Sequence, residues 1–395
     1  MRYARELPGT ADLVVIGGGI VGAATAFHGA RAGLRTVLLE ARPALCTLTT
    51  PVAAGAFRLQ FEDRDELRLV RESVDLFLNF RDATGQDRYD PRVSLQGYLW
   101  LATTQATAAR QRNLVERLRG WGQADVEIMD GVEVRRRFPF VGPDVVQARW
   151  RGGDGFVDTK ELTFGLAEGS GAEVVLDCRA TGFETARGWV TGVRTTRGNI
   201  SAGSVVVACG PFSGSVAGLA GVSLPVEAVR RHKLWIPALD AVAPGAPMTI
   251  DEETGAHWRP AFGGAWVLWT DPSTAPSEPT QAVAPDPAFA FDVLDPARPS
   301  SVARVAPFWR DVWEHGAHHW LVQAGQYTVT PDRKPILGPT SLEGLHVNTG
   351  YSGHGIMLGP AGSRTVVDLI TGAMDRAANP FALERPFELD ETPSL

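Results

Sequence analysis

The stretch Asp12-Leu-Val-Val-Ile-Gly-Gly-Gly-Ile-Val-Gly22 decides the fold of this chain. Its first five residues form a short apolar run that is typical of a buried strand. The pattern GxGxxG follows at Gly17, Gly19 and Gly22. Residues 23–32, which are rich in alanine, then predict a helix with a small-residue face. Strand, glycine turn and helix together indicate the start of a nucleotide-binding βαβ unit.

The segment Thr36-Val-Leu-Leu-Glu40 completes this unit, because it reads as a second buried strand that ends in an acid. Glycines allow the backbone to approach a pyrophosphate, and the N-terminus of the helix supplies N–H groups and partial positive charge. An acid at the position of Glu40 accepts hydrogen bonds from ribose hydroxyls. The motif alone leaves NAD and FAD open. Since no second GxGxxG follows a strand, we expect one site for one dinucleotide.

Composition excludes several classes of function. With 395 residues, the chain is expected to form one large or two medium domains. A formal net charge of -7 and the absence of a basic run argue against nucleic acid as a partner. Three dispersed cysteines without a CxxC pair predict neither a disulfide framework nor a metal site. No apolar run reaches the roughly 18 to 20 residues of a membrane span and no leader pattern is visible, so a cytoplasmic protein is expected.

Periodicity along the rest of the chain suggests two domains that are threaded through each other. Helical spacing of apolar residues predicts a helix from near Asp63 to Phe80, and a charged helix is expected over 108–119. Tyr98-Leu-Trp-Leu101 and the apolar runs after 174, 189 and 204 predict strands. Residues 271–308 are rich in proline and alanine, and loops or short strands are both open there.

Several motifs, in order along the chain, carry a resemblance to a known family. They are the first glycine loop with its acid, Gly155-Phe-Val-Asp158, Val205-Val-Val-Ala-Cys-Gly-Pro-Phe-Ser213, Tyr327-Thr-Val-Thr-Pro-Asp332, Pro335-Ile-Leu-Gly-Pro339 and Gly350-Tyr-Ser-Gly-His-Gly355. With these motifs the chain resembles the D-amino acid oxidase superfamily of FAD enzymes, in its sarcosine oxidase and glycine oxidase branch.

The resemblance implies an α/β (α+β) fold with two interleaved domains. A Rossmann-like FAD-binding domain of the glutathione-reductase type would be built from residues 10–90, 148–220 and 321–380. A substrate domain on a large mixed, mainly antiparallel sheet would be built from residues 91–147 and 221–320. The late glycine loop would open a helix, ended by Gly372, whose N-terminus points at the flavin pyrimidine edge.

The resemblance also implies which residues bind FAD. They are Gly17, Gly19, Ile20, Gly22, Glu40, Ala41, Arg42, Thr50, Ala180, Cys209, Gly210, Gly325, Gly353, His354, Gly355, Ile356 and Met357. Relatives attach the flavin through a cysteine at the position of Gly325 or through a histidine near residues 47–56. The chain has neither, so we expect non-covalent FAD.

Other departures concern the substrate. Sarcosine oxidases hold the substrate carboxylate with a lysine where this chain has Met357, and a lysine linked to oxygen activation aligns with Leu268. A histidine of the same hairpin becomes Pro272, and a tyrosine is expected to become Trp258. The pocket is therefore predicted to be more apolar and aromatic than a sarcosine site.

The candidates for catalysis are Arg58, Tyr327, His354, Trp258 and Met357. Arg58 has three readings: a partner of a substrate carboxylate, a partner of the flavin, or a surface residue before a helix. His354 is open between a hydrogen bond in the flavin loop and a role in proton handling. His257, Trp258 and Arg259 are either site residues or ordinary strand residues packed into a sheet.

We therefore predict an FAD-dependent amine or amino-acid oxidoreductase. It would remove hydride from an amine-bearing carbon to give an imine, on a larger or more hydrophobic substrate than sarcosine. The small-molecule amine would be the first partner, and oxygen or an electron carrier would be the acceptor; monomer and homodimer are both open. Two alternatives remain, an FAD-dependent 2-hydroxy-acid dehydrogenase and a flavin-binding protein without catalysis.

Overall fold

Two large sheets organise the chain, which a computed structural model describes for residues 2–316 and 319–388. The first sheet has the strand order β1 (Arg2–Tyr3), β9 (Glu173–Val175), β3 (Thr36–Leu39), β2 (Thr10–Ile16), β12 (Gly198–Val207), β11 (Trp189–Thr195) and β10 (Ala180–Ala186), with β20 (Leu345–Thr349) beside β12 and β19 (Ile336–Pro339) beside β20. Its central pairs β9–β3, β3–β2, β2–β12 and β12–β20 are parallel. This sheet carries the predicted βαβ opening, which is confirmed.

The second sheet is mixed and mainly antiparallel, as predicted. Its strand order is β17 (Pro276–Ser277), β13 (Glu227–Ile236), β16 (Gly264–Trp269), β15 (His257–Ala261), β14 (Met248–Asp251), β5 (Tyr98–Ala102), β7 (Gln147–Arg151) and β6 (Glu127–Asp130), with β18 (Leu321–Val329) beside β13. Only β14 and β5 pair in parallel among these described strands. A short pair, β4 (Ala56–Phe57) with β8 (Gly155–Phe156), lies apart from both sheets.

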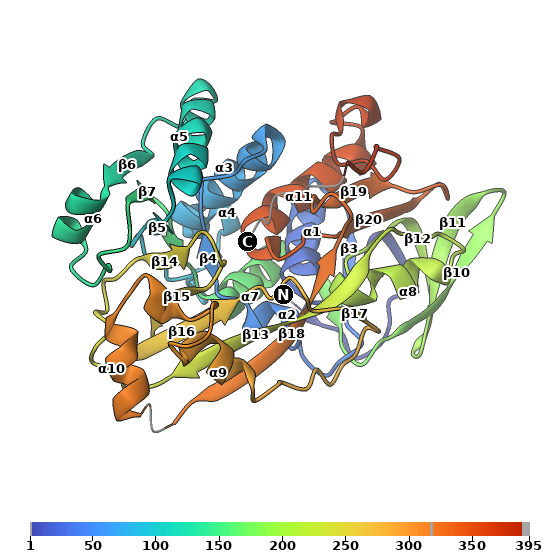
Figure 1. Cartoon of the computed structure of the whole chain (residues 1–395). Coiled ribbons are helices and arrows are strands. Elements are labelled where there is room, and N and C mark those ends of the chain that lie inside the picture. Colours follow the sequence, from blue (N-terminus) through green and yellow to red (C-terminus); the bar gives the residue numbers. More distant parts are fainter. Residues whose placement is uncertain (1, 317–318, 389–395) are drawn as a thin grey trace.

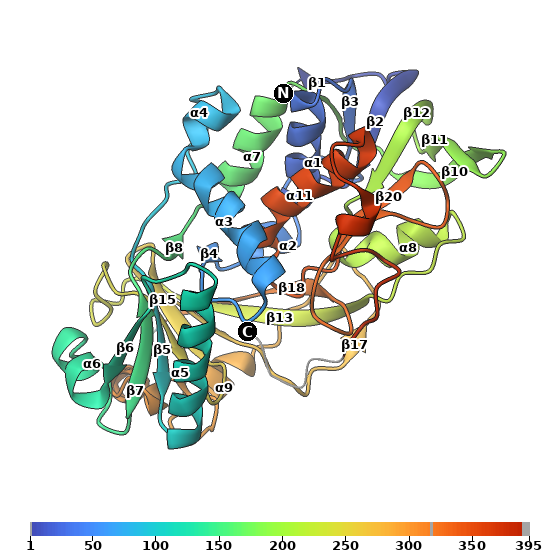
Figure 2. The ribbon, with the colours of Figure 1, turned by 90° about the horizontal axis from the view of Figure 1, so that it is seen from above.

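The helices cover these sheets unevenly (Figure 1). They are α1 (Ile20–Arg31), α2 (Thr49–Val52), α3 (Arg64–Leu78), α4 (Phe80–Thr84), α5 (Gln105–Gly120), α6 (Gly131–Arg137), α7 (Thr159–Ser170), α8 (Ser213–Gly218), α9 (Phe289–Leu294), α10 (Phe308–His315) and α11 (Gly355–Thr371), with short 3-10 turns at Gly210–Phe212, Val302–Arg304 and Arg376–Ala378. Helices α1, α3, α7 and α11 pack together over one face of the first sheet (Figure 2).

The side chains of β2 point alternately to the two faces of the sheet, and both faces are buried. Leu13 and Val15 lie in the core beneath α1 and α11, whereas Val14 and Ile16 pack on the other side, toward α8 and β10 to β12. Because successive side chains point to opposite faces, a strand buried on both sides must be apolar at every position. The continuous apolar run of the opening motif is the sequence signature of this burial.

Two predicted helices are confirmed, with one interruption. Asp63 caps α3 by accepting from the backbone N–H groups of Asp65 and Glu66, and the helix ends at Leu78 rather than running to Phe80. A separate short helix, α4, follows. The last long helix, α11, ends as predicted at Gly372, which adopts the left-handed conformation.

The expected domain boundaries are wrong for two strands. β18 pairs along its whole length with β13, and β7 pairs with β5, so both belong to the second sheet, although segments 148–220 and 321–380 are expected in the FAD-binding domain. Strand pairing joins residues that are far apart in sequence, so a local change of composition does not locate it. The remaining division into segments stays a prediction.

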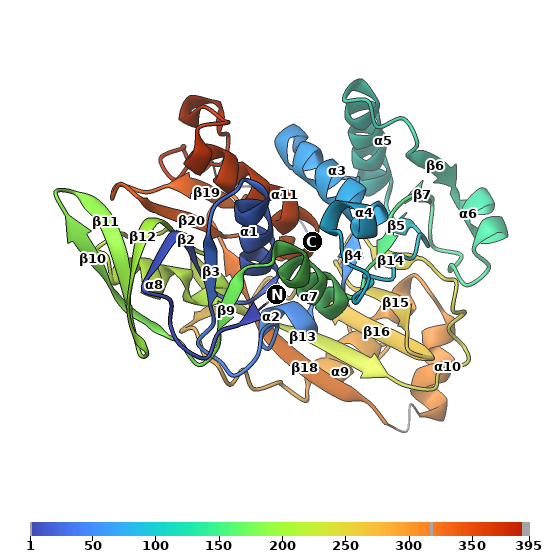
Figure 3. The ribbon, with the colours of Figure 1, turned by 180° about the vertical axis from the view of Figure 1, so that it is seen from behind.

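Residues 271–308 are also more helical than expected. They contain β17 but also α9, and α10 begins at their end. Phe289 and Val293 of α9 are buried against the lower face of the second sheet, beside Trp309 of α10. Figure 3 shows both helices at the lower edge of the view, near β16 and β18. Packing of these side chains stabilises helices that are too short to be stable alone. Across the described residues, no helix has the length and apolar character needed to cross a bilayer.

Candidate active site

The first glycine loop depends on two contacts that only glycine allows. Gly17 has a φ of +114°, and a Cβ there would lie 2.4 Å from the carbonyl oxygen of Ala208. A Cβ on Gly22 would lie 1.7 Å from the carbonyl oxygen of Gly17, so α1 can pack this closely only with glycine. The loop thus brings the free N–H groups at the start of α1 to the ends of β2 and β12, an arrangement that binds pyrophosphate.

Polar side chains hold this loop in place. The Glu40 carboxylate accepts from the backbone N–H of Gly18 at 2.7 Å and of Arg42 at 2.8 Å. Burial raises the pKa of Glu40, and these N–H groups counteract the increase. The hydroxyl of Thr50 accepts from the backbone N–H of Ile20 at 3.3 Å. Glu40 and Thr50 therefore flank the start of α1 from two different segments.

The far side of the loop is formed by the end of β12 and by the segment before β10. The Cys209 thiol donates to the carbonyl oxygen of Ile16 at 3.1 Å, and Gly210 follows with a φ of +53°. The backbone N–H of Asp177 donates to the carbonyl oxygen of Arg42 at 3.1 Å, which brings the segment leading to Ala180 beside the acid strand. The residues that the structure gathers around this loop are Gly17, Gly19, Ile20, Gly22, Glu40, Ala41, Arg42, Thr50, Cys209 and Gly210.

The second glycine loop turns directly over an aromatic ring. Gly353 has a φ of +104°, and a Cβ there would lie 2.6 Å from Cε2 of Tyr327 on β18. His354 then caps α11, which starts at Gly355. A Cβ on Gly355 would lie 3.7 Å from its nearest neighbour, on Tyr351, so the protein itself does not require glycine there. The close approach is therefore specific to Gly353.

A buried hydrogen-bond network ties the second loop to the first helix. The Tyr351 hydroxyl donates to Oδ1 of Asn348 at 2.5 Å. Nδ2 of Asn348 donates to Thr25 of α1 and to Ser363 of α11, both at 3.0 Å. Because every one of these side chains is buried, losing one partner would leave a desolvated polar group. The two glycine loops, more than three hundred residues apart, are thereby held as one unit.

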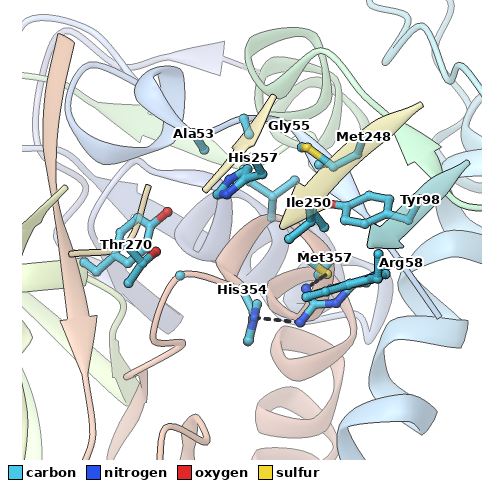
Figure 4. A pocket seen from close by; sticks show the side chains of 16 residues that line it. Ala53, Gly55, Arg58, Tyr98, Met248, Ile250, His257, Thr270, His354 and Met357 are labelled. Atoms are coloured by element: carbon cyan, nitrogen blue, oxygen red, sulfur yellow. Dashed lines mark hydrogen bonds between the residues drawn. The ribbon is translucent and has the colours of Figure 1, made fainter. Parts of the chain in front are cut away.

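A cavity lies between this unit and the second sheet (Figure 4). One wall comes from the sheet and one from the glycine loop and the β4 segment. The lining residues are Ala53, Ala54, Gly55, Ala56, Arg58, Tyr98, Trp100, Met248, Ile250, His257, Thr270, Tyr327, Gly353, His354, Ile356 and Met357. Most of these side chains are apolar or aromatic, and Arg58 brings a positive charge among them.

Arg58 is a buried residue, with 6% of its surface exposed, so it is not a surface arginine. Its Nη2 lies 3.3 Å from Nε2 of His354, and its Nη1 lies 4.0 Å from the Met357 sulfur. The guanidinium also stacks over Phe61, with Cζ 4.6 Å from the ring centre. Burial lowers the pKa of Arg58 from a value so high that the group stays charged. A fixed cation thus sits at the start of α11.

His257 adds a neutral acceptor on the sheet side of the cavity. Its Nδ1 lies 2.8 Å from the carbonyl oxygen of Gly255, so Nδ1 must carry the proton and donate, and Nε2 keeps a free lone pair. Burial, followed by the nearby charge of Arg58, lowers the pKa of His257 to about 4. At neutral pH this side chain is therefore an acceptor.

A family model described as FAD dependent oxidoreductase matches residues 12–369, which include both glycine loops and the cavity. The chain belongs to this family of FAD-dependent oxidoreductases. The family assignment explains why one chain has two glycine loops, since both can serve a single extended cofactor.

Similar proteins share most of this oxidoreductase's length. A D-amino acid dehydrogenase of Cereibacter sphaeroides is 27% identical over 91% of this chain and 92% of its own length. The sarcosine oxidase subunit beta of an Arthrobacter species is 26% identical over 95% of this chain and 90% of its own. Among solved structures, L-proline dehydrogenase from P. horikoshii is similar with a TM-score of 0.80 and 25% identity, covering 94% of this chain and 96% of that one.

The residues present fit FAD. The Gly17 to Gly22 turn leaves a cradle that a Cβ would fill, and the start of α1 provides N–H donors for a pyrophosphate. Glu40 retains lone pairs for ribose hydroxyls beyond the two N–H groups it binds. The Gly353 loop and the start of α11 face the cavity at the other end. FAD supplies the hydride acceptor of this oxidoreductase family.

Gly325 does not line the cavity but lies on β18 against α2. A Cβ there would be 3.5 Å from Cα of Thr49 and 3.6 Å from Cβ of Val52, which is ordinary contact. The position could hold a side chain, yet it has no nucleophile to bond a flavin. Non-covalent binding therefore stays the prediction.

The prediction of Trp258 as a catalytic residue is wrong. Trp258 is 1% exposed and packs against Phe140, Phe308 and Trp309 on the face of the second sheet opposite the cavity. Its neighbour His257 points into the cavity instead (Figure 4). A one-residue error in register reverses the face of a strand residue. The sequence alone favoured the tryptophan over His257, although both were candidates.

The remaining sheet residues of the cavity were not predicted. They are Tyr98, Trp100, Met248, Ile250 and Thr270. Alternation within Tyr98-Leu-Trp-Leu101 was a usable signal, since Tyr98 and Trp100 share one face and Leu99 and Leu101 lie in the core on the other. Nothing local in the sequence placed Met248 or Ile250 beside them, because β14 joins β5 from 150 residues away.

Proposed function

We propose that this oxidoreductase oxidises an amino acid or cyclic secondary amino acid larger or more hydrophobic than sarcosine, by hydride removal from the carbon that bears nitrogen. The observation that carries the proposal is a buried, charged Arg58 at one end of a cavity whose other walls are mainly apolar and aromatic. The relatives act on amino acids or N-methylated amino acids according to their names. FAD accepts the hydride when it is bound.

Arg58 is the proposed partner of the substrate carboxylate. A guanidinium presents two parallel N–H donors, which matches the two oxygens of a carboxylate. The aromatic rings of Phe61 and Trp100, whose centres lie 4.6 and 5.4 Å from Cζ, limit its movement. His354 and Met357 fix its other edge. A preorganised cation of this kind supplies both affinity and orientation.

The apolar wall is the proposed binding surface for the substrate side chain or ring. Met357 lies where a lysine would serve a small carboxylate in sarcosine oxidases, and it is buried beside Arg58. Tyr98, Trp100 and Ile250 extend the same surface along the second sheet. Burying apolar substrate surface there would contribute roughly 25 cal/mol per Å². Glycine and sarcosine have almost no such surface to bury.

His257 is the proposed acceptor for a substrate N–H. Its Nε2 carries a lone pair. With a pKa of about 4, the ring stays neutral at the pH values at which an amine is uncharged. A hydrogen bond from the amine to Nε2 would orient the nitrogen. Loss of water in the mainly apolar cavity would favour the uncharged amine. Hydride removal needs that form, because an ammonium has no lone pair to stabilise the developing imine.

Anaerobic reduction of the bound flavin tests the proposal. Holoenzyme is mixed with both enantiomers of proline, pipecolate, phenylalanine and N-methylphenylalanine, with sarcosine and glycine, and with lactate and mandelate as hydroxy acids. We expect bleaching at 450 nm to be at least tenfold faster with one of the bulky amino acids than with sarcosine, glycine or either hydroxy acid. Faster reduction by sarcosine would contradict the size preference, and faster reduction by a hydroxy acid would contradict amine chemistry.

The same holoenzyme preparation also identifies the electron acceptor. We propose a dehydrogenase that passes electrons to a carrier, because Leu268 replaces the lysine that relatives use toward oxygen. Stopped-flow mixing of reduced enzyme with air-saturated buffer should give slow reoxidation, and a dye acceptor should give fast reoxidation. Peroxide in stoichiometric yield during turnover would show an oxidase instead.

A further inference from the structure

A second cavity, with a volume of about 710 Å³, lies beside the first on the same face of the second sheet. On β15, His257 lines the first cavity and Arg259 lines the second, and alternate residues of one strand share a face. The β4–β8 pair separates them, with Ala56 in the first lining and its partner Phe156 in the second. The second cavity is therefore a neighbour of the flavin site and has no lining residue in common with it.

Two buried cations share one aromatic ring in this cavity. Lys233 is 2% exposed, and its Nζ lies 3.8 Å from the ring centre of Trp266. Arg259 is 9% exposed, with Cζ 4.2 Å from the same ring centre and 4.2 Å from that of Phe156. Within residues 2–316 and 319–388, neither cation forms an ion pair with a carboxylate. Two desolvated like charges without a counter-ion are costly.

Several hydrogen-bond donors around these cations lack an acceptor among the described residues. Nζ of Lys233 has one long contact, 3.5 Å to the carbonyl oxygen of Pro51. Nε of Arg259 and Nε1 of Trp235 are buried and lack a hydrogen-bond partner in the described part of the chain. Asp158 also lines the cavity, but its Oδ1 accepts from two backbone N–H groups as the cap of α7. The site presents donors that an anion would satisfy.

A large part of the remaining lining is apolar, which favours an anion with an apolar body. The apolar residues are Pro51, Phe156, Val157, Trp235, Leu239, Val242, Pro244, Pro260, Ala261, Phe262, Trp266 and Leu321. Polar residues also contribute to the lining, namely Arg92, Ser94, Gln96, Thr159, Lys160, Asp240 and Gln323. Phe262 is 71% exposed, so the apolar lining extends to the surface. A small hydrated ion such as phosphate would leave this surface unused, whereas a carboxylate on a flat apolar body would cover it.

We propose that this cavity binds an organic carboxylate with an aromatic or alicyclic body, its oxygens held by Lys233 and Arg259 and its ring packed against Trp235 and Trp266. The site is distinct from the substrate position beside Arg58. It goes beyond the proposed reaction, which uses only the first cavity.

Protonation of Lys233 should respond to the ligand. Burial, followed by the charges of Arg259 from β15 and Lys160 from α7, lowers the pKa of Lys233 to about 7. Two acids, Asp158 and Asp240, also line the cavity, and the charge of Asp158 counteracts the lowering of the Arg259 pKa by burial. A bound carboxylate would favour the charged amine, so binding above pH 7 must take up a proton. Affinity is therefore expected to fall as the pH rises.

Titration calorimetry with 2-naphthoate on flavin-loaded protein tests the site. The Arg58→Met substitution removes binding of the carboxylate at the first cavity. We therefore expect the Arg58→Met protein to bind one molecule of 2-naphthoate per chain. Adding Lys233→Met or Arg259→Met should weaken that binding at least tenfold, while Arg81→Met, at a 78% exposed arginine of α4 that does not line the cavity, should change it less than threefold. Affinity at pH 9 should be at least tenfold below that at pH 6.

Further measurements separate ligand binding from loss of fold. Flavin absorbance and the thermal midpoint without ligand should be retained in Lys233→Met, because the change removes an uncompensated buried charge. Neutral 2-naphthamide should bind at least tenfold more weakly than 2-naphthoate. The proposal is overturned if the Arg58→Met protein binds no 2-naphthoate, if the amide binds as tightly, if Arg81→Met has the same effect as Lys233→Met, or if inorganic phosphate binds more tightly than the naphthoate.

Discussion

Nη2 of Arg58 and Nε2 of His354 lie 3.3 Å apart at the start of α11. A guanidinium can only donate, so Nε2 of His354 is the acceptor and its ring is neutral, with the proton on Nδ1. Both side chains are buried, so Arg58 is not a surface residue, whereas its role toward a substrate carboxylate or the flavin stays a prediction. His354 positions Arg58, and the pair places a fixed positive charge where the second glycine loop opens its helix.

Replacing Arg58 by methionine should reduce kcat/KM by about 30- to 150-fold, because a charge-assisted hydrogen bond to a carboxylate contributes roughly 2–3 kcal/mol. Most of the change should appear in KM. The matched control is Arg81→Met, since Arg81 is 78% exposed on α4 and does not line the cavity. If Arg58→Met contains less bound flavin but keeps its kcat/KM per bound flavin, Arg58 serves the cofactor rather than the substrate.

Replacing His257 by leucine should lower kcat/KM about tenfold through loss of the acceptor Nε2, and glutamine should restore part of it. With a pKa of about 4, His257 is neutral above pH 6, so the shape of the pH profile between pH 6 and 9 should be the same in wild type and both variants. Steady-state rates across that range provide the measurement. A wild-type pH step near 6.5 that disappears in His257→Leu would mean that His257 titrates during catalysis.

Replacing Gly353 by alanine should impair flavin binding and reduction. The new methyl group would meet Cε2 of Tyr327 at 2.6 Å, and the φ of +104° is strained for any other residue. We expect a loss of at least tenfold in FAD affinity by fluorescence titration. Gly218→Ala is the control, because no atom lies within 4 Å of its Cβ and it lies in α8. Equal FAD affinity in both variants would contradict the role given to the second loop.

Replacing Glu66 by glutamine should stabilise the protein at alkaline pH. Burial, followed by the charge of Asp63, raises the pKa of Glu66 to about 8, from 4.5 in the unfolded chain. Below pH 4.5 both states bind the proton, and between 4.5 and 8 only the folded state does, so stability falls with rising pH in that window. The amide removes this loss, on the order of 2 kcal/mol at pH 8 after allowance for relaxation.

Urea midpoints of holoenzyme at pH 4.5 and pH 8 give the comparison for Glu66→Gln. The gain should be large at pH 8 and close to zero at pH 4.5. Glu116→Gln, at an exposed position of α5, is the control and should shift both midpoints equally. A Glu66→Gln gain that is the same at both pH values would show that Glu66 is ionised in the folded protein.

The nucleotide-binding half of the site was largely predictable because its chemistry is local. Gly17, Gly22 and Glu40 lie within one βαβ unit, and the turn, the close helix packing and the acid each need a residue type that the sequence displays. The cap at Asp63 and the stop at Gly372 are local in the same sense. Such features depend on backbone geometry over a few residues, so a short stretch specifies them.

The substrate half was less predictable because it is assembled across a sheet. Whether His257 or Trp258 faces the cavity depends on the register of β15 against β14 and β16, and both are polar or aromatic residues that suit either face. The expectation that the β18 segment belongs to the FAD-binding domain failed for the same reason, since its partner β13 lies about ninety residues earlier. When strands that are far apart in sequence pair, the pairing is decided by which faces of the whole sheet become buried.

The sequence by itself determined that this chain has a dinucleotide fold with a second glycine loop, because glycine is the only residue that tolerates those backbone angles and contacts. Only the tertiary structure decided that Arg58 is buried against His354, that His257 replaces Trp258 in the cavity, and that Lys233 and Arg259 meet on the ring of Trp266. The physical reason is that charge, protonation and accessibility follow from what surrounds a side chain, and those surroundings come from distant strands.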